Sequence, residues 1–239
     1  VDASRSRRLG EADEAELVSG TPPAPGRLPD PSRLEALLAR IGYRADRTVV
    51  AYDDEGGGWA GRLIWTLHVI GHPDWAYLDG GIHAWVAAGL PVATGPEPPP
   101  QRTRVSVTID PTPIAEIPDV LAAIGDPSSV IWDARSQAEY LGLRSGSRRA
   151  GHIPGAVNLD WLALMDPARR LRLIADLRAV LAAHGITPDK QVIPHCQTHH
   201  RSGLTYLAAR LLGFPKVRAY HGSWSEWGNR DDTPVETGA

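Results

Sequence analysis

The chain has 239 residues, 42% of them hydrophobic, and its 25 Lys and Arg residues against 28 Asp and Glu residues leave a net charge of -3. These values predict a soluble globular protein of one or two domains and exclude a disordered or fibrous chain. The charge balance gives no basic field for nucleic acid or an anionic membrane, and no apolar run approaches the roughly 20 residues of a membrane span. The single cysteine excludes internal disulfides and, with no signal-peptide pattern, leads us to expect a cytoplasmic protein.

The first predicted elements are a helix, a strand and a loop. Asp30-Pro31 is a helix start signal, so we expect an amphipathic helix over Leu34–Ile41. After a turn at Ala45-Asp46, the apolar run over Thr48–Tyr52 predicts a short buried strand. The glycines at 56–58 follow without the Lys-Ser/Thr that completes a phosphate-binding P-loop, and we interpret them as a permissive loop over a helix start.

A segment rich in proline separates this region from the rest of the chain. Its sequence is A-T-G-P-E-P-P-P-Q-R-T-R, and we expect a semi-rigid linker over 93–113, between a first domain at 1–92 and a second at 114–239. The second domain contains W-D-A-R, ending at Arg135, and G-H-I-P-G-A-V-N-L-D-W, ending at Trp161. The first domain has no counterpart of these segments and is predicted to be incomplete at its N-terminus.

The second domain then repeats the pattern of the first. We predict a helix over Leu171–Ala183 and a strand over Gln191–Pro194. The strand, loop and helix pattern that begins at Val192 lies 143 positions after the one that begins at Val49. Two homologous units of this order predict an α/β fold with two domains, each a mostly parallel sheet flanked by helices.

The cysteine lies where a predicted strand gives way to a loop and a helix, in V-I-P-H-C-Q-T-H-H-R-S-G. The free N–H groups and the positive dipole end of a helix N-terminus stabilise a thiolate at Cys196 over the thiol. Inward-turned N–H groups of the loop can form a nest for a negative atom. The pattern predicts a nucleophile that keeps an acquired group as a covalent intermediate. The residues expected to bind the substrate are Gln197, Thr198, His199, His200 and Arg201.

The residues of this loop argue against a purely structural cysteine and against a metal site, and they leave a second kind of enzyme chemistry open. A structural cysteine would not be followed by Gln-Thr-His-His-Arg, and nearly adjacent ligands on one tight loop rarely converge as a tetrahedral metal shell, so we expect no metal. Phosphatase or arsenate reductase chemistry with the same thiolate stays open. The loop is one residue shorter than the H-C-(five residues)-R-S/T loop of cysteine phosphatases, which favours a group smaller than phosphate.

These motifs resemble the rhodanese family of sulfurtransferases in its tandem two-domain form, and the C-Q-T-H-H-R loop is similar to that of a bacterial thiosulfate-type subgroup. The resemblance implies that Cys196 takes the outer sulfur of thiosulfate as a persulfide and passes it to cyanide or a thiol, without a cofactor. It implies that Asp133 and Arg135 support the loop from beneath and that Trp161 walls the pocket. A strand-end salt bridge and plain packing are the alternative interpretations of these residues.

The resemblance also gives the first domain a role. Asp53 occupies the repeat position of Cys196 and cannot form a persulfide, so the first domain is expected to be inactive while still shaping a cleft between the domains. A thioredoxin-like or other sulfur-acceptor protein is a candidate partner. A persulfide carrier or sensor is the alternative to an enzyme.

Overall fold

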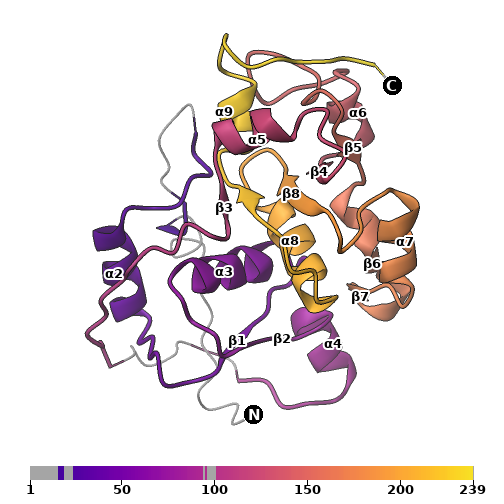
Figure 1. Cartoon of the computed structure of the whole chain (residues 1–239). Coiled ribbons are helices and arrows are strands. Elements are labelled where there is room, and N and C mark those ends of the chain that lie inside the picture. Colours follow the sequence, from indigo (N-terminus) through magenta and orange to yellow (C-terminus); the bar gives the residue numbers. More distant parts are fainter. Residues whose placement is uncertain (1–15, 19–23, 94, 96–100, 239) are drawn as a thin grey trace.

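The computed structural model describes residues 16–18, 24–93, 95 and 101–238 (Figure 1). A first unit runs from helix α2 to helix α4, and a second unit runs from strand β3 to helix α9. Within these described residues, none of the helices is both long enough and apolar enough to cross a bilayer.

The first unit places helices around a short parallel pair of strands. Its elements are α2 (Pro31–Arg40), β1 (Val49–Ala51), α3 (Gly58–Val69), β2 (Trp75–Tyr77) and α4 (Gly81–Ala87). β1 pairs with β2 in parallel, with Val49 opposite Trp75. The Asp30 carboxylate caps α2 by accepting a hydrogen bond from the Arg33 N–H at 3.0 Å. The helix and the strand predicted in this region are therefore confirmed, but the expectation that the strand is buried is wrong, because Val50 in its centre is 41% exposed.

The second unit is larger, and its central sheet is parallel. Its elements, with 3-10 helices marked η, are β3 (Ile114–Ala115), α5 (Ile117–Ala123), β4 (Ser129–Asp133), α6 (Gln137–Tyr140), β5 (Val157–Asn158), η2 (Trp161–Leu164), β6 (Met165–Asp166), η3 (Pro167–Arg169), β7 (Arg172–Leu173), α7 (Leu177–Ala183), β8 (Gln191–His195), α8 (Arg201–Leu211), β9 (Ala219–Tyr220) and α9 (Ser223–Trp227). The sheet order is β5-β4-β8, and β3 pairs in parallel with β9. The strand predicted over Gln191–Pro194 is confirmed as β8, whose end at His195 lies opposite Asp133 at the end of β4.

The helix predicted over Leu171–Ala183 is wrong in its first half. The chain there forms β7, antiparallel to β6, and α7 begins only at Leu177. Arg170 and Leu171 have φ angles of 62° and 60°, which are left-handed values that cannot continue into a right-handed helix. The apolar spacing that predicted one helix belongs to a short strand followed by a shorter helix.

The element order repeats along the chain as the sequence predicts. The series β1, α3, β2, α4 of the first unit recurs as β8, α8, β9, α9 of the second. The first residues of the long helices, Gly58 of α3 and Arg201 of α8, lie 201 − 58 = 143 positions apart. The α/β fold with two like units is therefore confirmed.

The two units meet where α3 packs against α8, near the middle of the molecule (Figure 1). A Cβ on Gly61 would lie 2.3 Å from the backbone carbonyl of Gly203, so only glycine allows this approach. One hydrophobic core runs through both units, and Trp65 on α3 donates its indole N–H to the Pro113 carbonyl at 3.0 Å. Because both glycines lie in the first turn of their helices, the loops that precede α3 and α8 face each other across the boundary.

The described part of the connecting segment lies along the first unit. Residues 94 and 96–100 of the linker predicted at 93–113 lie outside the described residues. From residue 101 the chain forms no helix or strand until β3, and the N–H groups of Thr103 and Asp110 donate to the carbonyl oxygens of Ala39 and Val69. These hydrogen bonds hold the segment against the first unit on its way to the second.

Candidate active site

Cys196 directly follows β8, so the parallel sheet places its thiol at the carboxyl end of a central strand, ahead of α8. The residue is 1% exposed. Its backbone N–H donates to the Ser223 hydroxyl at 3.3 Å, and its carbonyl accepts a hydrogen bond from the Trp224 N–H at 2.9 Å. The Ser202 hydroxyl donates to Sγ at 3.4 Å. The sulfur is therefore buried beside polar groups and is not sealed in apolar packing.

The loop between Cys196 and α8 keeps its backbone donors free. Among the described residues, no acceptor takes the N–H groups of residues 197–201. His199 in this loop adopts a left-handed φ of 57°. Successive N–H groups in a loop with a left-handed residue form a concave site for an anion. The geometry therefore provides a nest at the N-terminus of α8, next to the sulfur.

The matching loop of the first unit shows what such a nest holds. Asp53 occupies the repeat position of Cys196, and its carboxylate accepts hydrogen bonds of 2.8–3.2 Å from backbone N–H groups of its own loop and of α3. The donors are Glu55, Gly56, Gly57 and Ala60. In the first unit an aspartate thus supplies the negative charge that a thiolate supplies at Cys196.

The surroundings of Cys196 favour the ionised sulfur. Burial on its own raises the pKa of the Cys196 thiol, but the charge of Arg201 and the hydrogen bonds from Ser202 outweigh burial, so the pKa lies below its ordinary value. The charge of His200 lowers this pKa further. Because the thiolate is the nucleophilic form of cysteine, this environment favours the nucleophilic form of Cys196.

His199 lies inside the site and not at the surface. Its imidazole is fully buried and edge-on to Trp65, with ring centroids 4.5 Å apart, and Nδ1 lies 2.8 Å from Ser202 Oγ. Burial lowers the pKa of His199 well below its usual range, so the ring is neutral. Since Ser202 gives its hydrogen to the sulfur, we assign the His199 Nδ1–H as the donor to Ser202 Oγ. A direct contact between the His199 side chain and the substrate stays a prediction.

Arg201, the first residue of α8, forms a two-pronged ion pair with Glu139 of α6. The two N···O distances are 2.7 and 2.8 Å. Glu139 also caps α6 by accepting hydrogen bonds from the N–H and hydroxyl of Ser136. Burial raises the pKa of Glu139, but Arg201 and Ser136 together lower it to about 2. The pair fixes the Arg201 guanidinium beside the loop, where its charge still acts on the sulfur.

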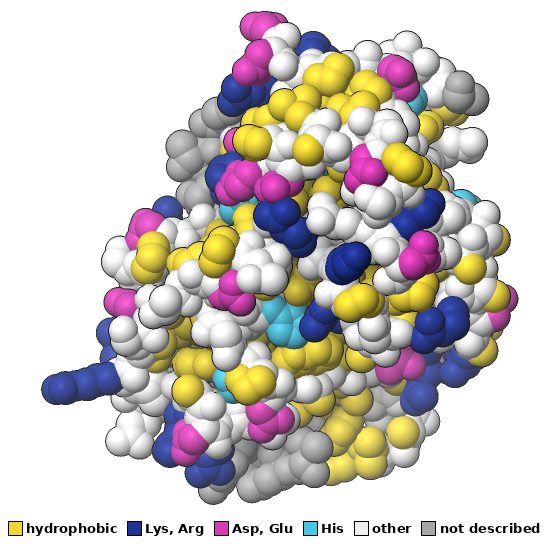
Figure 2. Space-filling model, viewed as in Figure 1, with side chains coloured by type: hydrophobic (Ala, Val, Ile, Leu, Met, Phe, Trp, Pro, Cys, Tyr) yellow, Lys and Arg dark blue, Asp and Glu magenta, His cyan; other side chains and the backbone are white. Residues whose placement is uncertain are grey.

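His200 lies at the boundary between the two units. Its Nε2 is hydrogen-bonded to Glu55 of the first unit, and its ring centroid lies 4.6 Å from that of Trp59 and 5.7 Å from that of Trp161. The His200 side chain is 24% exposed, so it reaches the rim of the site. On the face shown in Figure 2, histidine and basic side chains gather along the middle of the molecule, where the two units meet.

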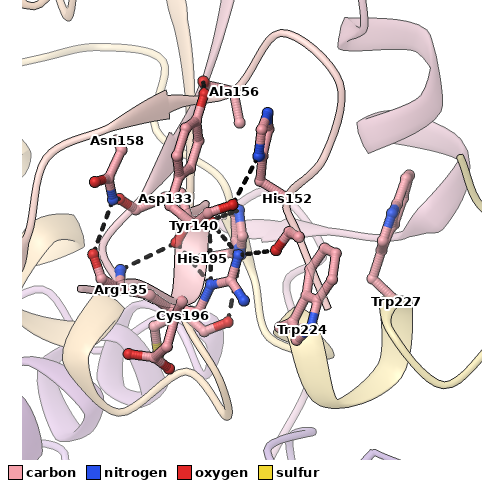
Figure 3. Close-up of polar contacts among 12 residues, drawn as sticks. Asp133, Arg135, Tyr140, His152, Ala156, Asn158, His195, Cys196, Trp224 and Trp227 are labelled. Atoms are coloured by element: carbon pink, nitrogen blue, oxygen red, sulfur yellow. Dashed lines mark hydrogen bonds and ion pairs between the residues drawn. The ribbon is translucent and has the colours of Figure 1, made fainter. Parts of the chain in front are cut away.

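A buried ion pair between Asp133 and Arg135 lies next to the loop, at the end of β4 (Figure 3). Both side chains are fully buried; Arg135 donates to Asp133 through Nε at 2.9 Å and to the Gly151 carbonyl through Nη2 at 2.8 Å. The guanidinium lies 4.3 Å from the ring centroid of Trp224. His195 Nε2 lies 3.8 Å from Asp133 Oδ2. The pair therefore contacts both the residue before Cys196 and the residue that holds the Cys196 carbonyl.

The other predicted loop residues make mainly structural contacts. Gln197 Nε2 donates to the Ser147 hydroxyl at 3.1 Å. The backbone of Thr198 lies so close to Gly26 that a Cβ on this glycine would come within 2.2 Å of the Thr198 carbonyl oxygen. In the part of the chain that the structure describes, His, Cys, Asp and Glu side chains do not gather in threes as metal ligands do.

The arrangement of two units, each with a strand, a loop and a helix in this order, is also found in known proteins. The rhodanese-like domain family matches residues 15–88 and 116–230. The chain belongs to the rhodanese family. A thiosulfate sulfurtransferase of Pseudomonas aeruginosa is 52% identical over 91% of this chain and 80% of its own length, and one of Azotobacter vinelandii is 50% identical over 99% and 90%. The crystal structure of YnjE matches with a TM-score of 0.84 at 28% identity, over 95% of this chain but only 56% of that one.

Several residues of this rhodanese site escape sequence reasoning. Glu55 and Trp59 come from the first unit, and Glu139 comes from α6. The only sequence signal for Glu139 is the capping box S-Q-A-E, which places its carboxylate at a helix start but does not connect it to Arg201. Glu55 carries no signal beyond its place in the loop that the repeat aligns with the cysteine loop.

Proposed function

We propose that this chain is a thiosulfate sulfurtransferase in which Cys196 is the nucleophile and only the second unit is catalytic. The observation that carries the proposal is the polar burial of Cys196, with Ser202 donating to the sulfur, Arg201 lowering its pKa and free backbone donors lining the loop. Two relatives of at least 50% identity are named thiosulfate sulfurtransferase, which supports thiosulfate as the sulfur donor.

The reaction is a double displacement. The Cys196 thiolate attacks the outer sulfur of thiosulfate; a new S–S bond forms, the old S–S bond breaks, and its electron pair leaves with sulfite. The enzyme is then a persulfide whose terminal sulfur carries the negative charge. Cyanide or a thiolate attacks that sulfur, the electron pair of the persulfide bond returns to Cys196, and the product leaves as thiocyanate or a new persulfide.

The residues around the sulfur have different roles in this reaction. The loop N–H groups stabilise the terminal sulfur of the persulfide, as preorganised donors stabilise an oxyanion. Arg201, held by Glu139, braces the loop and supplies the charge that keeps the thiol ionised. The Asp133 and Arg135 pair supports the loop at the sheet, and Trp161 walls the site beside His200.

We assign residues 1–92 to a first domain without catalytic activity, 93–113 to the linker, and 114–239 to a second domain that carries the active cysteine. Asp53 already accepts hydrogen bonds from the Glu55, Gly56, Gly57 and Ala60 N–H groups, so these donors are not available to an anionic substrate. Its carboxylate also cannot form a persulfide. The first unit therefore contributes by packing α3 against α8 and by lining the boundary at which the cysteine loop lies.

The test is intact-mass measurement after incubation with thiosulfate. The protein is expected to gain the mass of one sulfur atom, to lose it on addition of cyanide, and to turn over to thiocyanate. In Cys196→Ser no gain is expected, and a gain in that variant would refute the assignment. A gain without turnover would identify a persulfide carrier, whereas no gain in the wild type, together with release of phosphate from a phosphate ester, would identify a phosphatase.

A further inference from the structure

A hydrogen bond between Glu55 and His200 links the two facing loops. Glu55 comes from the loop before α3, and His200 comes from the loop before α8. Glu55 Oε1 also accepts a hydrogen bond from the Trp59 N–H at 3.3 Å, so the start of α3 orients the carboxylate. A Cβ on Gly58 would lie 2.6 Å from His200 Nε2, so glycine at this position leaves room for the pair.

The contacts of His200 suit a cation at a partly exposed position. Its ring centroid lies 4.6 Å from that of Trp59 and 5.7 Å from that of Trp161, and the faces of indole rings attract a cation. Its side chain is 24% exposed and that of Glu55 is 33% exposed, so the pair lies at the rim while Cys196 is buried behind it. The imidazole is therefore a partly exposed group on the loop that carries the buried Cys196.

The charged and titratable groups around His200 come from both units. Glu55 and Asp53 face it from the first unit, while Cys196, Arg201 and the neutral His199 share its loop or the helix that follows. Burial alone lowers the pKa of His200, but the hydrogen bond and charge of Glu55 outweigh burial and raise the pKa above its ordinary value. The charges of Cys196 and Asp53 act in the same direction.

We propose that Glu55, from the unit without a catalytic cysteine, is a positioning residue that holds His200 as an imidazolium at the entrance to Cys196 and thereby selects a dianionic sulfur donor. The inference rests on the proposed function, because it concerns the donor half of that reaction. It gives the first unit a chemical role beyond packing. The charge of the pair's imidazolium offsets the repulsion between the thiolate and the approaching dianion.

The test is steady-state kinetics in which thiosulfate and cyanide are varied separately, from about pH 6 to pH 9, the range in which histidines change charge. In a double displacement, kcat/KM for thiosulfate reports only the donor half-reaction. In Glu55→Gln, His200 loses its proton at a lower pH, so kcat/KM for thiosulfate falls about tenfold above neutral pH, the size of one charged hydrogen bond. The value of kcat/KM for cyanide is expected to change less than about twofold, because that step brings no dianion to the site.

Two further variants separate a charge effect from a structural one. Glu55→Gln with His200→Lys carries a permanent cation and is expected to recover kcat/KM for thiosulfate and to lose the pH dependence. Asp46→Asn removes an exposed carboxylate that pairs with Arg44 in the same unit and is expected to match the wild type. If Glu55→Gln does not fold, His200→Lys alone tests the charge effect: its permanent cation is expected to remove the pH dependence of kcat/KM for thiosulfate.

The outcomes distinguish this inference from the proposed function. A wild-type protein that gains sulfur from thiosulfate, beside a folded Glu55→Gln variant with unchanged kcat/KM and pH profile, would overturn the inference alone. An equal loss in the thiosulfate and cyanide half-reactions, not recovered by His200→Lys, would overturn it as well and assign Glu55 a structural role. A wild type that gains no sulfur would overturn the proposed function first.

Discussion

The ion pair between Glu139 and Arg201 makes a measurable prediction about stability. A shift of the pKa of Glu139 from 4.5 to about 2 corresponds to about 3.4 kcal/mol at 1.36 kcal/mol per pKa unit. The side chains of Glu139 and Arg201 are 10% and 20% exposed, so solvent screens part of this energy. Glutamine at position 139 also keeps one acceptor for Arg201. We therefore expect Glu139→Gln to lower the free energy of unfolding by about 2 kcal/mol at neutral pH.

The pH dependence of this stabilisation follows from the downward shift of the Glu139 pKa. Because the pKa of Glu139 is depressed in the folded state, its stabilisation is fully present above pH 4.5 and is lost as the pH falls toward 2. Urea unfolding of the wild type and of Glu139→Gln should therefore show a difference that is constant near neutral pH and shrinks on acidification. Asp46→Asn, in an exposed ion pair, is the control. A difference below about 0.5 kcal/mol at neutral pH, typical of a surface pair, would refute the reasoning, as would a difference that persists unchanged in acid.

Two further substitutions test the nests. Ser202→Ala removes a hydrogen bond to the sulfur, so the pKa of Cys196 should rise and alkylation by iodoacetamide should slow about fivefold at neutral pH, whereas Ser128→Ala, far from the site on an exposed turn, should not change the rate. An unchanged pH profile of alkylation in Ser202→Ala would contradict the assigned donor. Asp53→Ala leaves the N–H groups of the first nest without their anion and should lower the free energy of unfolding by about 2 kcal/mol in denaturant titration. A variant as stable as the wild type would show that the nest does not depend on the carboxylate.

The fold was predictable where local signals are strong. The capped helix α2, the apolar strands β1 and β8 and the internal repeat are all visible in the sequence, because capping, burial and periodicity act over a few neighbouring residues. The β6 and β7 hairpin was not predictable, since it depends on left-handed conformations at Arg170 and Leu171, which neither residue type favours. Pairing with β6 in the folded chain stabilises this turn, and propensity cannot anticipate it.

The residues of the site also divide into those that local sequence predicts and those that only the folded chain brings together. Cys196 and the residues that follow it are contiguous, so their chemistry can be inferred from the loop itself. The carboxylates that set the charge of the loop are distant in sequence: Glu139 lies 62 residues from Arg201, and Glu55 lies 145 residues from His200. Such partners are brought together only by the packing of α3 on α8 and of α6 beside the loop. The inward orientation of His199 is likewise a result of packing, against Trp65.

The Asp53 loop and the Cys196 loop present similar backbone donors but differ in the anion that these donors stabilise. Each lies between a strand and a helix start, and each presents backbone N–H groups that require a negative charge. In the first unit the charge is permanent, because the Asp53 carboxylate belongs to the chain and accepts those hydrogen bonds itself. In the second unit the proposed charge is the thiolate of Cys196, which in the proposed reaction gains one sulfur atom and loses it again. The same backbone donors therefore stabilise structure in one unit and can stabilise a reaction intermediate in the other, and one residue at the end of the strand decides between these uses.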